Sequence, residues 1–305
     1  MNETPIIDMH MHLFPRFGGI AQARHYGRYF DTLAGKEMQG LTPSFVNSDS
    51  APEVAIAYMD WCGVQKGVLL QGSLHGPQNS FYVDVLRRWP DRFVAMAMVD
   101  PTEGEQAAKE LRHWTDAGCL GMKIEMDSLH KVRSEYEFMG KNEMKVWEVV
   151  AEKNLPVVLH MTQDERSLKE GEGILELLRR WPELNFVICH IGVPPFTGWQ
   201  QRAMLAQHPN IYLDIAAVYW YYHEDHGETY PVPSGMAALQ WAVEHVGADK
   251  LLWGSDYPQA LMLLTYRQMI DLVRVEAEFL TDAQRAQILG GNAQQLLVRW
   301  QQNRH

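Results

Sequence analysis

Short apolar runs rich in β-branched residues alternate along the chain with longer segments in which apolar residues recur every three or four positions. The short runs have the length of strands, and the longer segments have the periodicity of amphipathic helices. The runs predicted to be strands are residues 6–12, 67–71, 93–99, 121–124, 156–161, 185–191, 211–215 and 251–255. Alternation of strands and helices predicts a parallel sheet covered by helices.

Helical periodicity fills most of the sequence between these runs. The segments predicted to be helices are residues 51–62, 78–89, 103–117, 142–153, 173–181, 199–207 and 236–246, followed by two or more helices within residues 265–302. Thr281 to Gln284 has the pattern of a capping box at a helix start. Gly290, Gly291 and Asn292 are predicted to interrupt the helical run before the last helix.

Eight predicted strands favour an α/β fold in which the sheet closes into a (β/α)₈ TIM barrel, as a single domain over residues 1–305. The rival is an open doubly wound sheet, which usually carries a Gly-rich loop after its first strand, whereas this strand ends in His-Met-His. The loops after strands one and seven, residues 13–50 and 216–235, are long. Both follow strand carboxyl ends, so we expect them to shape a substrate pocket.

Composition narrows the class of protein. The chain has 305 residues, 46% of them hydrophobic, which is ordinary for a globular protein. A net charge of −11 without a Lys/Arg run argues against nucleic acid as a partner. The sequence shows no signal peptide and no apolar run of membrane-spanning length, which predicts a cytoplasmic protein without a membrane partner. Cys62, Cys119 and Cys189 are far apart and are predicted to be buried, reduced thiols.

Five polar residues stand where predicted strands end. His10 and His12 are two positions apart on one strand and therefore share a face, and His160, His190 and Asp256 each end an apolar run. A solvated strand end or a hydrogen-bonded core histidine would explain any one of them. Strand ends converge in a barrel, so together they predict a metal site. Imidazole and carboxylate suit Zn²⁺, Mn²⁺, Fe²⁺ or Co²⁺, and the lack of cysteine argues against a structural zinc.

Short motifs in a fixed order carry a family resemblance. They are IDMHMH at residues 7–12, VLH at 158–160, CHIG at 189–192, WGSDYP at 253–258 and GNA at 291–293. Their order resembles the amidohydrolase superfamily, in particular the branch that contains aminocarboxymuconate-semialdehyde decarboxylase and related metal-dependent hydrolases. The resemblance implies one divalent ion, Zn²⁺ with Mn²⁺ as the alternative, held by His10, His12, His160 and Asp256. It also implies catalytic roles for His190 and for Asp256.

The resemblance implies hydrolysis of a small, carboxylated cyclic or aromatic compound by a metal-activated water. The alternative is non-oxidative decarboxylation of such a compound on the same metal. A third reading, a non-catalytic binding protein, predicts that one of the five site positions has been lost, and all five are present. The expected partner is a small-molecule substrate, and a homodimer is compatible with this branch.

Two further groups are candidate substrate contacts. Lys123 and Glu125 share a face of one strand. Other amidohydrolases carry a carboxylated lysine that bridges two metals near this place, but we favour an ion pair with Glu125 or a contact with a substrate carboxylate. Arg16, with Arg24 and Arg28 in the same long loop, either pairs with a substrate carboxylate or is a solvated surface charge.

The aromatic segment from Tyr219 to Tyr230 is the second such group. Tyr219 and Trp220 are the predicted contacts there, and packing against a neighbouring subunit explains the segment equally well. His223 and His226 are not expected to hold a second metal, because a flexible loop is a poor cage.

Overall fold

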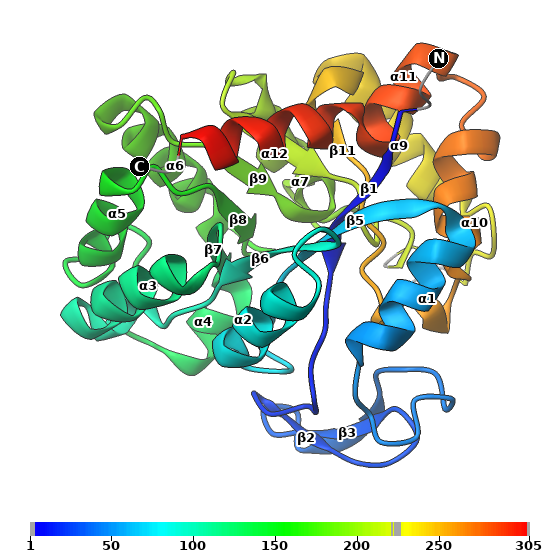
Figure 1. Cartoon of the computed structure of the whole chain (residues 1–305). Coiled ribbons are helices and arrows are strands. Elements are labelled where there is room, and N and C mark those ends of the chain that lie inside the picture. The colour runs from blue at the N-terminus through cyan, green and yellow to red at the C-terminus, as the bar shows by residue number, and fades with distance from the viewer. Residues whose placement is uncertain (1–3, 221, 223–226, 304–305) are drawn as a thin grey trace.

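The computed structural model describes residues 4–220, 222 and 227–303, and it contains all eight predicted strands. They are β1 (Ile6–Met11), β5 (Val64–Leu69), β6 (Phe93–Ala97), β7 (Gly121–Glu125), β8 (Val157–His160), β9 (Phe186–Ile188), β10 (Ile211–Asp214) and β11 (Leu251–Leu252). Neighbours pair in this order and in parallel. The Met9 amide donates to the Trp253 carbonyl at 2.9 Å and the Asp256 amide to the His10 carbonyl at 2.8 Å, which closes the ring. The predicted barrel is confirmed (Figure 1).

Helices follow the strands as predicted. They are α1 (Pro52–Cys62), α2 (Asn79–Arg88), α3 (Glu105–Ala117), α5 (Glu143–Glu152), α6 (Arg166–Arg180), α7 (Trp199–Met204) and α9 (Pro233–His245), and α4 (Met126–Val132) is an unpredicted short helix. The C-terminal region holds α10 (Tyr266–Asp271), α11 (Asp282–Ala286) and α12 (Asn292–Gln302), with π-helical turns at Leu272–Glu276 and Gln287–Gly291. Single 3₁₀ turns lie at Pro101–Glu103, Cys189–Gly192, Leu205–Gln207, Ala248–Lys250 and Gln259–Met262.

Two local predictions in the C-terminal region have different outcomes. The capping box is confirmed, because the Thr281 side chain accepts from the Gln284 amide and the Gln284 side chain accepts from the Thr281 amide. The predicted interruption at Gly290–Asn292 is wrong, because the backbone stays helical through a widened turn. Gly290 is needed for close packing instead: a Cβ there would lie 1.7 Å from the carbonyl oxygen of Pro5.

The barrel interior is packed and covered at its amino-terminal end. One apolar cluster combines strand residues such as Met9, Val68 and Leu252 with Leu296 and Trp300 of α12. Figure 1 shows α12 crossing the end of the barrel at which β1 begins. A larger cluster fills the layer between the strands and the surrounding helices. The carboxyl ends of the strands are therefore the face at which a pocket can form.

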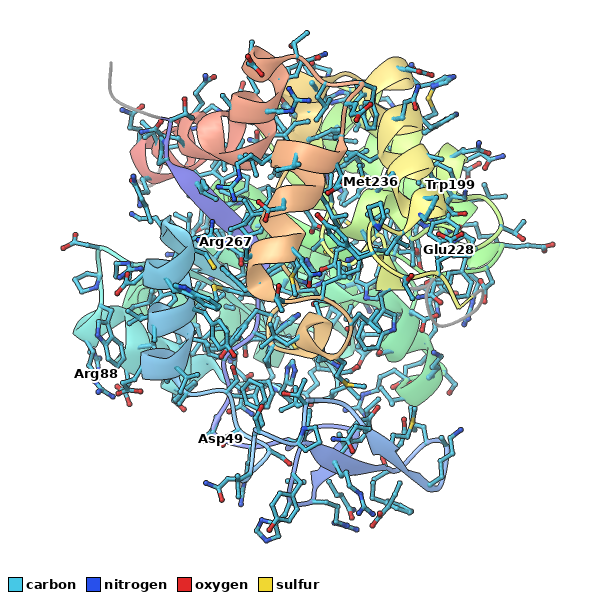
Figure 2. The ribbon with its side chains drawn as sticks, turned by 90° about the vertical axis from the view of Figure 1, so that its right-hand side faces the viewer. Asp49, Arg88, Trp199, Glu228, Met236 and Arg267 are labelled. Carbon is cyan, nitrogen blue, oxygen red and sulfur yellow. The ribbon has the colours of Figure 1, made fainter. Side chains whose placement is uncertain are left out.

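A small antiparallel sheet in the loop after β1 was not predicted. It consists of β2 (Ala21–Ala23), β3 (Arg28–Asp31) and β4 (Lys36–Gln39), and we call residues 15–49 the insertion. Its own core contains Phe17, Tyr29 and Leu41. Phe14 and Ser50 join its two ends through reciprocal backbone hydrogen bonds of 3.2 and 2.8 Å. Figure 2 shows the insertion at the lower edge of the molecule, with Asp49 where the chain returns towards α1.

The three cysteines are buried and unpaired, as predicted. None of the helices in the described part of the chain combines the length and the apolarity needed to cross a bilayer.

Candidate active site

A cavity of about 320 Å³ lies at the carboxyl ends of the barrel strands. The five residues predicted from strand ends all line it: His10, His12, His160, His190 and Asp256. The insertion adds part of the wall, with residues from β3, β4 and the turn after β4. The cavity is therefore built from segments that are far apart in the sequence and that the barrel brings together.

The closest group in the cavity is formed by His10, His12 and Asp256. The two imidazole Nε2 atoms are 3.2 Å apart. Asp256 Oδ1 lies 3.0 Å from Nε2 of His12 and 3.5 Å from Nε2 of His10. Both histidines are buried. His10 lies within the stretch between Asp8 and Met11 where the pairing of β1 with β5 shifts register.

Each of these rings is held by its other nitrogen. Nδ1 of His10 lies 2.9 Å from Asp214 Oδ2, and Nδ1 of His12 lies 2.7 Å from the Leu70 carbonyl. A carbonyl only accepts and a carboxylate accepts when ionised, so Nδ1 carries the proton and Nε2 keeps its lone pair. Two lone pairs facing each other at 3.2 Å repel unless a cation lies between them. Two imidazole nitrogens and a carboxylate oxygen suit a divalent ion, so these residues fit the implied metal.

His160 lies in the same cavity but outside this closest group. Its ligand nitrogens do not lie within 4.8 Å of all three ligand atoms of His10, His12 and Asp256. Its Nδ1 is 3.5 Å from Glu125 Oε1, and its buried Nε2 has no hydrogen-bond partner. An unpartnered Nε2 beside the group is consistent with a fourth ligand, and that role stays a prediction.

Local backbone geometry delivers Asp256 to the group. A Cβ at Gly254 would lie 2.7 Å from the His10 Cβ, so only glycine lets the segment after β11 approach β1 this closely. Asp256 itself has φ of 61°, a left-handed conformation that costs free energy in a non-glycine residue. Burial raises the pKa of its carboxyl, but the adjacent imidazoles of His12 and His10 outweigh burial and lower this pKa well below its ordinary value.

His190 also lines the cavity. Its Nδ1 lies 2.7 Å from the Ala216 carbonyl, so the neutral ring offers Nε2 as an acceptor. Burial, with the neighbouring His10 charge, lowers the pKa of His190 to about 3, so the ring is neutral near pH 7. Its ring centroid lies 4.7 Å from that of His10 and 5.1 Å from that of His160.

Asp214 is a positioning residue that the sequence analysis missed. It ends β10 and is fully buried, with Oδ2 on the His10 ring and Oδ1 accepting from the His190 amide at 2.8 Å. Burial raises the pKa of its carboxyl, but His10 outweighs burial and lowers the pKa to about 2. Asp214 also ends an apolar run, so the rule that found His160 could have found it.

Replacing Asp214 with asparagine is expected to weaken metal binding about 10- to 100-fold, because the His10 ring loses a charged acceptor that fixes its orientation. Competition with a chromophoric chelator measures the affinity. Asp249→Asn, at an exposed position, is the matched control and should bind metal like the wild type. A folded Asp214→Asn variant with wild-type affinity would contradict this role.

Lys123 and Glu125 both line the cavity from β7. Lys123 is 1% exposed, and its Nζ donates to Cys189 Sγ at 3.4 Å. Glu125 accepts from the Ser73 amide at 2.6 Å. Burial raises the pKa of Glu125, but the hydrogen bond from His160 outweighs burial and lowers it well below its ordinary value. Their roles as substrate contacts stay predictions.

Arg16 does not reach the cavity. It is exposed at the start of the insertion and is not among the lining residues. Arg24 and Arg28 form ion pairs with Glu37 of the same small sheet. The insertion folds on its own core, so these arginines lie on its surface.

The two predicted aromatic contacts, Tyr219 and Trp220, have different outcomes. Trp220 lines the cavity. Tyr219 is buried behind it, where its hydroxyl donates to the Ser255 carbonyl at 3.0 Å and supports the turn that carries Asp256. Tyr219 is therefore corrected from a substrate contact to a buried support. Tyr221, His223 and His226 lie outside the described residues.

His75 is a second lining residue that the sequence analysis missed. It lies in the loop between β5 and α2 and is 2% exposed. Its ring stacks on Phe14 with centroids 4.2 Å apart and lies 5.0 Å from the His12 ring. Burial, with the neighbouring His12 charge, lowers its pKa to about 3. No sequence signal marks it, because it stands within a polar loop and not at a strand end.

The sequence is similar to that of known proteins. The model of the amidohydrolase family matches residues 7–299. An L-fucono-1,5-lactonase from Burkholderia ambifaria is 30% identical over 138 residues, which is 40% of this chain and 44% of that protein, so the match spans less than half of the lactonase. A 4-sulfomuconolactone hydrolase from Hydrogenophaga intermedia is 22% identical over 72% of this chain and 69% of its own length.

Solved structures share the fold. A zinc-bound amidohydrolase from Burkholderia multivorans has a TM-score of 0.74 at 16% identity, covering 95% of this chain and 98% of that chain. A 5-carboxyvanillate decarboxylase from Sphingomonas paucimobilis has a TM-score of 0.68 at 17% identity, covering 96% of this chain and 98% of that chain. The shared barrel thus serves both a hydrolase family and a decarboxylase.

Proposed function

The chain belongs to the amidohydrolase family, and from this premise we propose that it is a metal-dependent hydrolase that opens the ring of a small cyclic ester. The observation that carries the proposal is the facing pair of Nε2 atoms on His10 and His12 with Asp256 Oδ1 at 3.0 and 3.5 Å. The names of two relatives, a lactonase and a muconolactone hydrolase, favour a lactone as the class of substrate. Zinc is the proposed ion, since a structure of the same fold holds it.

Each residue of the metal group has its own role in the proposed reaction. A divalent ion held by His10, His12, Asp256 and His160 would lower the pKa of a water molecule and polarise the ester carbonyl. Asp256 would accept the proton that the attacking water loses and return it to the ring oxygen that leaves. In the net reaction, one water forms a C–O bond to the carbonyl carbon, the ring C–O bond breaks, and a hydroxy acid results.

The position of the His190 proton favours one catalytic role over another. A neutral ring whose Nδ1 proton is bonded to the Ala216 carbonyl has no second proton with which to polarise a substrate carbonyl. It can accept a hydrogen bond at Nε2 instead. We therefore assign His190 to orienting the attacking water.

Decarboxylation is the second candidate function. The buried Lys123 amine at the cavity wall favours it, because that amine could bind the carboxylate that leaves. A structure of the same fold is named as a decarboxylase.

Turnover with and without metal tests the proposal. Enzyme purified without chelators is assayed on a panel of five- and six-membered lactones by pH-stat, and on hydroxylated aromatic acids by CO₂ release. We expect one equivalent of acid per lactone opened, loss of activity on chelation, and recovery with Zn²⁺. Metal-dependent CO₂ release without lactone opening would assign the lyase instead, and no turnover on either panel would reject both. Circular dichroism before and after chelation controls for loss of the fold.

A further inference from the structure

We propose that the ring bound in this cavity is uncharged and hydroxylated, and that His75 hydrogen-bonds one of its hydroxyl groups. The proposal rests on the proposed function and narrows its substrate class. It replaces the expectation of a carboxylated substrate.

The cavity has no unbalanced positive charge that could pair with a substrate carboxylate. Lys123 is the only lysine or arginine among the described residues that line it. Against this amine and a divalent ion stand the carboxylates of Glu125, Asp256 and, directly behind His10, Asp214. The positive and negative charges therefore balance when the ion is bound. Burying a further carboxylate without an opposite charge is costly, whereas a hydroxyl needs only hydrogen-bond partners.

His75 offers such a partner. Its ring lines the cavity, and its buried Nε2 has no hydrogen-bond partner in the protein. The ring is held nearly parallel to Phe14 and Phe17, with centroids 4.2 and 6.1 Å away. Buried polar atoms are almost always paired, so an unpaired one in a cavity wall indicates a ligand group.

The remaining polar lining is also uncharged. Gln39 and Gln259 both contribute to the wall. The Gln39 amide nitrogen is already committed, since it donates to the carbonyls of Tyr26 at 2.7 Å and Leu41 at 2.5 Å. Its side-chain carbonyl is the atom left to accept a bond from a ligand. The side-chain amides, the unpaired Nε2 of His75 and the indole of Trp220 together suit a hydroxylated ring.

The test compares lactones that differ in one property. The zinc-loaded enzyme is assayed on D-galactono-1,4-lactone, which is hydroxylated and uncharged, on muconolactone, which carries a carboxylate, and on γ-butyrolactone, which carries neither group. We expect kcat/KM for the hydroxylated lactone to exceed that for the carboxylated one at least about tenfold. Equal values or the reverse order would overturn the proposal.

Variants at position 75 test the residue. His75→Phe keeps the ring volume without its nitrogens, and we expect kcat/KM to fall about tenfold on the hydroxylated lactone and to change less than about twofold on γ-butyrolactone. His75→Gln, whose amide can replace the lost bond, should restore part of the difference. Equal losses on both lactones would indicate a structural role and would overturn the assignment of His75. Metal content and thermal midpoint confirm that each variant is folded and loaded.

Failure of the inference and failure of the proposed function give different results. Turnover of lactones without preference for hydroxyl groups rejects the inference and keeps the function. If none of the three lactones is opened, calorimetric titration of the wild-type enzyme with the same lactones decides: tighter binding of the hydroxylated one keeps the inference, and equal or reversed affinities reject it.

Discussion

Replacing Asp256 with asparagine is expected to lower kcat for ring opening about 10³-fold, because an amide cannot accept the proton of the attacking water. The carboxylate lies 3.0 Å from Nε2 of His12, and its lowered pKa keeps it ionised through the mildly acidic range. We therefore expect the loss at every pH from about 5 to 8. The measurement is kcat at saturating Zn²⁺, so that weaker metal binding does not contribute to the difference.

A control variant and a metal analysis show whether the loss in kcat comes from the Asp256 carboxylate itself. Asp249→Asn makes the same chemical change on the surface and should leave kcat unchanged. Metal analysis of the Asp256→Asn sample separates loss of the proton acceptor from loss of the ion. A metal-loaded Asp256→Asn enzyme with wild-type kcat would remove Asp256 from the chemistry.

Replacing His12 with alanine should remove both the bound metal and the activity, with a fall in kcat/KM of about 10³-fold or more, since a bound metal contributes several kcal/mol to transition-state stabilisation. His12 contributes one of the two facing Nε2 atoms, and its ring is fixed by the Leu70 carbonyl. Metal content by mass spectrometry and kcat/KM on the best lactone are the two readouts. His113→Ala, at an exposed position, is the control. Added imidazole should restore part of the activity of His12→Ala, and an untreated variant with full metal content and rate would show that His12 is not a ligand.

The barrel could be predicted from sequence because its strands are buried on both faces. A parallel strand then appears as a continuous apolar run, and eight such runs separated by helical segments leave few alternatives. The convergence of His10, His160 and Asp256 follows from the same topology, because each ends a run and parallel strands end on one face. Residues placed by topology were therefore found.

The sequence analysis did not find the residues whose positions depend on the tertiary path of a loop. The strands of the insertion have three or four residues each, too few for a clear alternation, and their stability comes from contacts such as Phe17 with Tyr29. Tyr219 was predicted to contact the substrate, yet it is buried behind the pocket wall. For Arg16 the sequence left open a substrate contact or a surface charge, and the structure places it on the surface. Which way a loop side chain faces depends on distant partners that a local pattern does not contain.

The orientation of the imidazole rings could not be predicted from the sequence either. The proton of His190 is placed by the Ala216 carbonyl, 26 positions away, and that of His12 by the Leu70 carbonyl, 58 positions away. Sequence motifs identify the histidines of the site, but only the folded backbone determines which nitrogen of each ring carries the proton.

The reciprocal backbone hydrogen bonds between Phe14 and Ser50, which form a neck at the base of the insertion, make it a segment that can be replaced as a unit. Its two ends leave and rejoin the barrel side by side, so another hairpin of suitable span can be grafted between them without displacing any residue of the metal group. The part of the pocket wall that the insertion supplies can thus diverge while the residues of the proposed metal group stay unchanged. A barrel enzyme with such a neck can acquire a new substrate through a single loop replacement.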